Sequence, residues 1–344
     1  MKVGRISAFG GPEVLEILEV PTPRPATGEV LVKLHAAGLN RADLNIREGR
    51  FAEAPLPIVL GVEGAGEVAA VGDGVTGFAI GDRVVINPMV VCDECEACAA
   101  GRDSECPRLQ VVGEHFDGTY AEYIALPARN MIAAPEGLGY EALAASIVAY
   151  MTAWHMLKTR GQLLEGETVL IVGAGSGVAS AAVQVAKALG ATVIATTSTE
   201  QKEQQVRALG ADEVINYRAE PDFHEAVRKL TGGLGVDLVH ETVGRATVGK
   251  SILSARHGGR LVGMGSHTGS VAELDLWSIY RREVTLIGCH TSNRPEIAEF
   301  LPLLADGSLR PIVDSVFPLA DAADAQERLN APDRFGRVVL STTS

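Results

Sequence analysis

The sequence has no long hydrophobic run. Its longest apolar stretches, such as 168–172, are far shorter than the roughly 20 apolar residues of a membrane-spanning helix. Residues 1–5 lead directly into a strand-like pattern, with neither the apolar core nor the small-residue cleavage site of a signal peptide. We therefore expect a cytoplasmic protein without a membrane partner.

Basic residues are also few. The 344 residues include 30 lysines and arginines but 43 aspartates and glutamates, so the net charge is −13. No dense basic run interrupts this acidic balance, and such a surface repels nucleic acid and anionic membranes. We expect no nucleic-acid partner and attribute the acidity to solubility.

Cysteine is scarce and unevenly placed. Four of the five cysteines, Cys92, Cys95, Cys98 and Cys106, lie within 15 residues of sequence. A disulfide framework would spread its cysteines along the chain, so the cluster favours a metal site. Four thiolates close a tetrahedral zinc shell and leave no open position for water or substrate. We therefore expect one zinc per chain, with a structural role.

Two other interpretations of the cluster remain. One is an iron–sulfur cluster, since Cys106-Pro107 is similar to the end of a ferredoxin motif, although that motif has three residues before its last cysteine and this chain has seven. The other is a set of unmetallated thiols. The fifth cysteine, Cys289, lies in a predicted buried strand and is interpreted as a small core residue.

The chain is long enough for two domains of roughly 100–200 residues each. Its first part is rich in glycine, proline and short β-type runs, as in a small irregular barrel. From residue 167 onward, apolar strands alternate with helical segments, which predicts an α/β protein with a doubly wound parallel sheet. The predicted strands are 168–172, 192–197, 213–215, 236–240, 260–263 and 284–288, and the predicted helices are 177–189, 200–209, 223–230 and 247–253.

The C-terminal tail carries one more predicted helix, 295–305, and a final strand, 337–340. A doubly wound sheet is already complete at six strands, so we expect the tail to rejoin the first domain. The predicted division is therefore residues 1–152 with 289–344 as one domain, including a metal lobe at about 90–110, and residues 153–288 as a dinucleotide-binding domain.

A glycine-rich turn leaves the first of these strands and opens a helix. Small residues there let the backbone approach a pyrophosphate, whose charge is stabilised by the N–H groups of the helix N-terminus. A packing turn is the alternative, but the flanking strand, the helix and the next strand all fit a dinucleotide site. The candidate cofactor-binding residues are Ala174, Gly175, Ser176, Gly177 and Val178.

The end of the next strand bears on the choice of cofactor. NAD sites usually place an acidic residue there, whereas this chain has Thr196–Thr199 followed by Lys202. Hydroxyl groups and a lysine can bind a 2′-phosphate, which favours NADPH over NADH, with Ser198 and Lys202 as ligands. Ser198 and Gln201 also fit a helix-capping box, and Glu200 is the residue that opposes the NADPH interpretation.

These features together resemble the medium-chain dehydrogenase/reductase superfamily, which includes zinc alcohol dehydrogenases and quinone oxidoreductases. The resemblance covers almost the whole chain and implies a GroES-like β-barrel catalytic domain, a nested Rossmann domain, a small-molecule substrate and a homodimer or homotetramer. Besides the cysteine cluster and the glycine-rich turn, the motifs that carry it are Gly38–Asp43, Gly61–Gly66, Gly81–Val84, Asp117–Tyr123 and Met151–Trp154.

The resemblance fails at the catalytic metal. Zinc alcohol dehydrogenases hold that ion with a cysteine, a histidine and a second cysteine or similar ligand, and the matching positions here are Asn40, Val62 and a position at or near Val148. Valine has no lone pair to offer a metal. The chain therefore resembles the quinone oxidoreductase-like branch, which includes zinc-free quinone and enoyl reductases.

That branch implies further cofactor contacts. Thr152 matches a threonine beside the nicotinamide, and Lys202 and Tyr217 match residues that contact the 2′-phosphate of NADPH. Val243 and Gly265 complete the candidate cofactor-binding set.

The resemblance and the residues predict hydride transfer from NADPH to a conjugated acceptor, a quinone, enone or enoyl thioester. Conjugation spreads the developing charge onto a distant oxygen, which hydrogen bonds can stabilise without a metal. Asn40 is the candidate donor, or else it braces a turn; His115 is the candidate acid, or else a structural residue. The tyrosines that some relatives use fall at Phe51 and Asn45, so water is an alternative proton source.

Two other functions remain as alternatives. One is a zinc-type alcohol or aldehyde dehydrogenase with unusual metal ligands, and the other is an NADPH-binding sensor without turnover.

Overall fold

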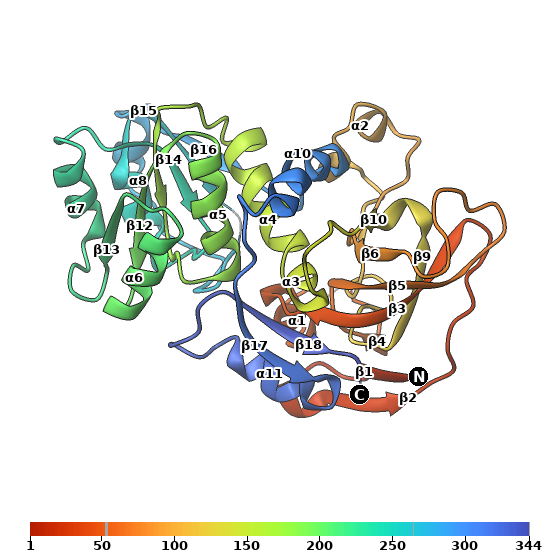
Figure 1. Cartoon of the computed structure of the whole chain (residues 1–344). Coiled ribbons are helices and arrows are strands. Elements are labelled where there is room, and N and C mark those ends of the chain that lie inside the picture. The colour runs from red at the N-terminus through yellow and green to blue at the C-terminus, as the bar shows by residue number, and fades with distance from the viewer. Residues whose placement is uncertain (52–53, 264, 344) are drawn as a thin grey trace. The chain divides into compact units, whose positions relative to one another are not determined.

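The computed structural model describes residues 1–51, 54–263 and 265–343. The chain divides into two compact units, Met1–Val148 with Pro311–Ser344 (unit 1) and Ala149–Arg310 (unit 2) (Figure 1). No helix in the described ranges is long and apolar enough to cross a membrane.

Unit 1 is built mainly on antiparallel strands, and β17 and β18 pair in parallel. Its largest sheet has the order β10-β6-β5-β3-β18-β17, and β9 also pairs with β3. A three-stranded sheet, β2-β1-β4, and the short pair β7-β8 complete it. The strands are β1 (Lys2–Ile6), β2 (Leu15–Glu19), β3 (Glu29–Gly38), β4 (Ile58–Val59), β5 (Glu63–Val71), β6 (Arg83–Ile86), β7 (Met89–Val90), β8 (Gln110–Val111), β9 (Tyr123–Pro127), β10 (Met131–Ala133), β17 (Val313–Pro318) and β18 (Arg337–Ser341).

The helices of unit 1 are short. They are α1 (Arg41–Arg47), α2 (Glu96–Ala99), α3 (Tyr140–Ala144) and α11 (Ala322–Arg328), and α4 (Ile147–Trp154) begins here and continues into unit 2. The strand β3 organises the core because Val30, Val32 and Leu34 are buried along it. Its ladder with β5 shifts register near Leu34, where a side chain on Gly66 would collide with the Lys33 carbonyl.

Unit 2 contains the predicted parallel sheet. Its six strands have the order β13-β12-β11-β14-β15-β16, which confirms the α/β doubly wound architecture. The strands are β11 (Thr168–Ile171), β12 (Thr192–Thr197), β13 (Glu213–Asn216), β14 (Val236–Glu241), β15 (Ala255–Gly263) and β16 (Thr285–Gly288). The helices are α5 (Gly177–Ala188), α6 (Glu200–Ala208), α7 (Phe223–Leu230), α8 (Val248–Ser254), α9 (Leu276–Tyr280) and α10 (Arg294–Ala305).

The two units differ from the division expected from the sequence. We expected residues 289–310 to leave the dinucleotide-binding domain, but they belong to unit 2. The reason is aromatic packing between α4 and α10: the ring of Phe300 lies 6.3 Å from that of Tyr150 and 6.1 Å from that of Trp154. Only the segment from Pro311 onward rejoins unit 1, where β18 pairs antiparallel with β3.

One local element has no counterpart in the sequence pattern. The helix α4 continues as a π-helix over His155–Arg160, because its residues bond five positions back along the chain. Single-turn π segments are often found at functional sites.

Candidate functional site

The glycine-rich turn joins β11 to α5 and is held in place by β12. The N–H of Gly173 donates to the hydroxyl of Thr196 at 3.0 Å, and the N–H of Ala174 donates to the Thr196 carbonyl at 2.9 Å. Gly173 has a φ of +70°, a conformation that favours glycine. Ser176 caps α5 by accepting the N–H of Ala179 at 3.2 Å. This is the strand–turn–helix geometry that an anionic pyrophosphate requires.

The carboxyl end of β12 lies next to this turn. The side chain of Lys202 covers Gly175, since its Nζ lies 3.4 Å from where a Cβ on that glycine would be. The Thr197 hydroxyl is buried and has no hydrogen-bond partner among the described residues. The carbonyl of Thr197 accepts the N–H of Tyr217, whose side chain is 40% exposed. The fold therefore gathers a cation and hydroxyl groups at the edge of the turn.

The expected capping box at Ser198 is wrong. Thr199 is the residue before α6, and its hydroxyl accepts the N–H of Lys202 at 3.3 Å. The strand β12 ends at Thr197, but the backbone of Thr199 is still extended, so the helix begins one residue later than the Ser198–Gln201 pattern implies. Ser198 is buried and free of the capping role.

Two more candidate cofactor residues lie near the turn. A methyl group of Val243 lies 3.1 Å from where a Cβ on Gly173 would be. Gly265 has a φ of +102°, and a Cβ there would lie 3.0 Å from the Thr242 carbonyl oxygen. Thr152 is buried on α4.

The carboxyl end of β14 is ordered by Glu241. One of its carboxylate oxygens accepts the N–H of Val243 at 2.7 Å and the hydroxyl of Thr247 at 3.0 Å, and the other accepts the hydroxyl of Ser251 at 2.5 Å. The neighbouring His240 is fully buried, and burial lowers its pKa to about 4. Among the described residues neither ring nitrogen of His240 has a hydrogen-bond partner, so the neutral ring serves packing.

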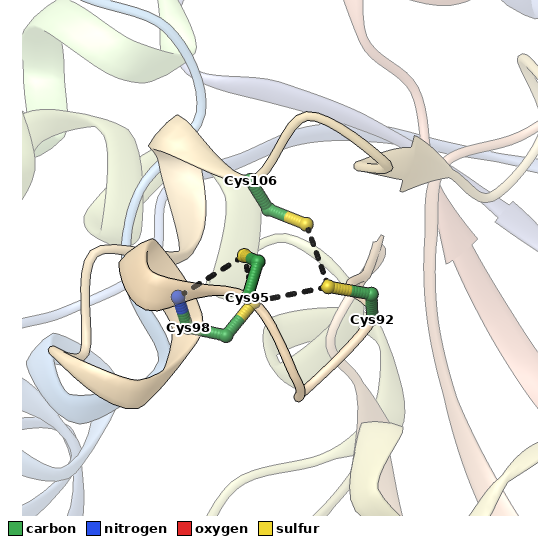
Figure 2. A group of neighbouring side chains, drawn as sticks. All are labelled: Cys92, Cys95, Cys98 and Cys106. Carbon is green, nitrogen blue, oxygen red and sulfur yellow. Dashed lines mark hydrogen bonds between the residues drawn. The ribbon is translucent and has the colours of Figure 1, made fainter.

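Figure 2 shows the four clustered sulfur atoms converging on one point from α2 and its flanking loops. Neighbouring sulfurs are 3.4 Å apart for Cys95 and Cys98, 3.5 Å for Cys92 and Cys106, and 3.8 Å for Cys92 and Cys98. A tetrahedral ion with zinc–sulfur distances of about 2.3 Å separates its ligands by about 3.8 Å. The sulfur positions therefore fit zinc.

Backbone donors favour the thiolate form of one cysteine in this cluster, Cys92. The N–H groups of Glu94 and Cys95 donate to Cys92 and lower the pKa of that thiol to about 6. Bound zinc would replace the protons that the other thiols carry. In the described part of the chain these cysteines are the one group of three or more His, Cys, Asp and Glu side chains placed to share an ion.

Two of the positions that match the catalytic metal ligands, Asn40 and Val148, bond to a buried ion pair instead. The Glu63 carboxylate accepts Asn40 Nδ2 at 2.8 Å, the N–H of Val148 at 2.8 Å and the guanidinium of Arg337. The same guanidinium donates to Asn40 Oδ1 at 2.8 Å. Together with Val62, which is buried and has no ligand atom, this arrangement does not fit a catalytic zinc ion.

The two residues predicted to act in catalysis have partners within unit 1. Both N–H bonds of the Asn40 amide are used, one by Glu63 and the other by the Gly38 carbonyl at 3.3 Å. This favours the bracing role over donation to a substrate. The Nδ1 atom of His115 accepts the N–H of Val111 at 3.1 Å, which closes the turn after β8.

Sequence reasoning missed Glu63 and Arg337 as partners. They are separated by 274 positions, and no local pattern connects them. It also missed the buried pair of His155 and Glu296 in unit 2.

Residues 26–136 match the family of alcohol dehydrogenase GroES-like domains, and residues 177–306 match the zinc-binding dehydrogenase family. An alcohol dehydrogenase from Geobacillus stearothermophilus is 33% identical over 99% of both chains. Quinone oxidoreductase from Homo sapiens is 31% identical over 99% of this chain and 97% of its own length. An acryloyl-coenzyme A reductase from Metallosphaera sedula is 33% identical over 95% of this chain and 96% of its own length.

Solved structures agree with these relatives. A crystal structure of an NAD-dependent alcohol dehydrogenase has 42% identity and a TM-score of 0.96, covering 99% of this chain and 100% of its own. Mycobacterial Rv1454c complexed with NADPH has 31% identity and a TM-score of 0.85, with 99% and 100% coverage. The chain therefore belongs to the medium-chain dehydrogenase/reductase superfamily and is a nicotinamide-dependent oxidoreductase that acts on small molecules.

Proposed function

We propose that this enzyme reduces conjugated acceptors, namely enones, enoyl thioesters or quinones, without a catalytic metal. The observation that carries the proposal is the Asn40–Glu63–Arg337 network, which holds Asn40, one of the three positions that match the zinc ligands, in hydrogen bonds to an ion pair. Valine at position 62 and an ion-paired carboxylate offer no set of three metal ligands. The acryloyl-coenzyme A reductase and the quinone oxidoreductase among the relatives support the same substrate class.

The substrate class follows from the missing Lewis acid. A simple aldehyde places the developing charge on one oxygen, which a metal commonly stabilises. In an enone or enoyl thioester the hydride adds to a carbon of the double bond, and in a quinone it adds to the ring system. The negative charge spreads to an oxygen farther away, where hydrogen bonds are sufficient to stabilise it. The bound nicotinamide cofactor supplies the hydride. Since Asn40 and His115 have internal partners, we propose that water supplies the proton.

We propose NADPH as the preferred cofactor, held at its 2′-phosphate by Ser198, Lys202 and Tyr217. The support is the absence of an acidic residue in Thr196–Thr199 and the position of Lys202 over Gly175. We further propose that the 174–178 turn holds the pyrophosphate, and that Thr152, Val243 and Gly265 lie toward the nicotinamide end.

Alcohol dehydrogenase is the second candidate. Most of the similar proteins carry that name, including the solved structure with 42% identity. Such an activity here would require a zinc ion held by side chains other than the matching ones.

A panel of acceptors tests the proposal. Oxidation of NADPH and of NADH is followed with an enone, a quinone, acryloyl-coenzyme A and a longer enoyl thioester, and oxidation of 1-alkanols with NADP or NAD is the control. Zinc content is measured on the same preparation. We expect acceptor reduction with one zinc per chain. Faster alcohol oxidation with two zinc ions per chain would establish the second candidate, and tight NADPH binding without turnover would indicate a sensor.

A further inference from the structure

Unit 2 contains a buried carboxylate, that of Glu296, which accepts hydrogen bonds from three side chains. The side chain of Glu296 is 7% exposed and that of His155 is 3% exposed. Nδ1 of His155 lies 2.8 and 3.1 Å from the two carboxylate oxygens, so it carries a hydrogen, because a carboxylate only accepts. The hydroxyl of Thr159 donates at 2.8 Å, and Nδ2 of Asn293 donates at 2.7 Å.

These donors come from two separate segments of the chain. His155 and Thr159 belong to the π-helix that extends α4, while Asn293 is the residue before α10. Figure 1 shows α4 beside α10, in agreement with the packing of Phe300. Glu296 therefore connects the end of α4 to the loop 289–293.

Both connected segments lie near the carboxyl end of β16, since Nε of Arg160, in the π-helix, donates to the carbonyl of Gly288 at 3.2 Å. The loop 289–293 follows the carboxyl end of β16, and the N–H of Cys289 donates to the carbonyl of Gly263, at the carboxyl end of β15. In open parallel sheets, ligands bind beyond these strand ends. Thr152 precedes His155 by three positions, so the two lie on the same side of the helix.

The connection through Glu296 is not the only one between these helices in the described residues. The same two helices are joined by aromatic packing and by an exposed ion pair, in which Lys158 Nζ lies 2.7 Å from Glu299 Oε2. A buried ionised carboxylate is costly unless its hydrogen bonds are complete, and a π-helical turn is rare without a functional reason. The two helices are therefore joined by the costly buried pair His155–Glu296 as well as by the exposed pair Lys158–Glu299.

We propose that His155 and Glu296 form a positioning pair that fixes Thr152 and the loop 289–293 as the two walls around the nicotinamide end of the cofactor. This inference rests on the proposed location of that end at Thr152. The pair does not contact the reacting atoms; it acts by orienting the residues that do.

The test distinguishes binding at the nicotinamide end of the cofactor from binding of the remainder. Dissociation constants are measured for whichever of NADPH and NADH binds the wild type more tightly, and for the matching fragment without nicotinamide, 2′-phospho-ADP-ribose or ADP-ribose. The variants are His155→Ala, which removes the bond, and His155→Gln, whose amide keeps one bond to Glu296. Lys158→Ala is the matched control, because it breaks the exposed pair between the same two helices.

We expect His155→Ala to weaken binding of the whole cofactor roughly tenfold, because a displaced pocket wall loses its contacts, while fragment binding changes less than about twofold. His155→Gln should recover part of the loss, and Lys158→Ala should change neither constant. Equal weakening of cofactor and fragment, or no change in either, would overturn the proposal. If His155→Ala does not fold, His155→Gln is compared with Lys158→Ala. His155→Gln should then weaken binding of the whole cofactor more than binding of the fragment, and Lys158→Ala should change neither. Turnover is not measured, so failure of the proposed reaction leaves this test intact.

Discussion

At the scale of single residues, the proposed preference for NADPH depends on one lysine. Lys202 is the cation nearest the turn at Gly175, and no carboxylate precedes it in Thr196–Thr199. We expect Lys202→Ala to raise the KM for NADPH roughly 10- to 100-fold, the usual effect of losing a charged hydrogen bond, and to leave the KM for NADH nearly unchanged. Steady-state kinetics with both cofactors measure the effect.

The control for that prediction lies on the same helix. Arg207 is in the last turn of α6, where it pairs with Glu203 and Glu213. Arg207→Ala should leave both KM values unchanged. An equal rise in the KM values for NADH and NADPH in the Lys202→Ala enzyme would contradict a role at the 2′-phosphate.

A second residue-scale prediction concerns the network that replaces the metal ligands. Glu63→Gln removes the only carboxylate bonded to the buried guanidinium of Arg337 in the described structure. An unpaired buried charge costs about 3–5 kcal/mol, so we expect the free energy of unfolding to fall by that amount. Urea denaturation measures it. The control is Glu67→Gln on the same strand, an exposed residue bonded to the Tyr140 hydroxyl, which should cost less than about 1 kcal/mol.

The pH dependence of stability contains a third prediction. Burial raises the pKa of Asp43 from 3.8 to about 7, although the N–H of Asn40 and the hydroxyl of Tyr120 lower it. The folded state therefore binds the proton more tightly than the unfolded state. The stability from this group is fully present below pH 3.8 and is lost as the pH rises through about 7.

Asp43→Asn isolates that contribution, because asparagine cannot ionise. We expect the free energy of unfolding of the wild type, minus that of the variant, to decrease steadily from pH 4 to pH 7. Subtraction also removes the contribution of His240, whose pKa is lowered to about 4. That contribution has the opposite pH dependence, because it is lost as the pH falls below 6.5. A pH-independent difference would show that Asp43 does not titrate in this range.

At the scale of elements, the cysteine lobe is the part least able to fold by itself. Its helix α2 has four residues, and its strands β7 and β8 have two residues each. Elements this short do not persist without tertiary support, and bound zinc would supply that stabilisation.

We therefore expect Cys106→Ser, or treatment with a strong chelator, to release the zinc and to open residues 91–111 while both units stay folded. Zinc analysis and the rate of tryptic cleavage at the exposed Arg102 and Arg108 follow the change, with circular dichroism as the measure of the remaining fold. Cys289→Ser is the matched control and should keep its zinc. Loss of the whole circular dichroism signal with the metal would contradict a local role.

At the scale of the whole molecule, the parallel sheet of unit 2 has an exposed apolar strand at one edge. The strand β16 lies at the end of its sheet, and Leu286 on it is 43% exposed. The nearby helix α9 exposes Leu276, Trp277 and Tyr280. Exposed apolar edge strands invite pairing, and a strand can pair with its own copy about a two-fold axis.

We expect this edge to be the contact of the homodimer that the family resemblance implies. Leu286→Asp should convert the dimer to a monomer in sedimentation velocity experiments. Leu234→Asp, at an exposed apolar residue before β14, is the control and should leave the assembly unchanged. A wild-type monomer, or a Leu286→Asp dimer, would refute this contact.

Local patterns in the sequence were sufficient for most elements. The predicted bounds of 192–197 and 223–230 coincide with β12 and α7, because hydrophobic periodicity and turn residues act within a few positions. The spacing of the four cysteines likewise predicted their convergence. The capping box at Ser198 failed, since Thr199, whose backbone is still extended, is the residue that caps α6.

The sequence by itself determined the order of strands and helices, the glycine-rich turn, the metal lobe and the absence of ligands at Val62. Only the tertiary structure decided that Arg337 pairs with Glu63, that His155 pairs with Glu296, and that residues 289–310 stay with unit 2. The physical reason is that a buried charged group needs a partner, but any suitable group that the fold brings near can be that partner. Partners separated by more than a hundred positions leave no periodic trace in the chain, whereas a helix or a strand does.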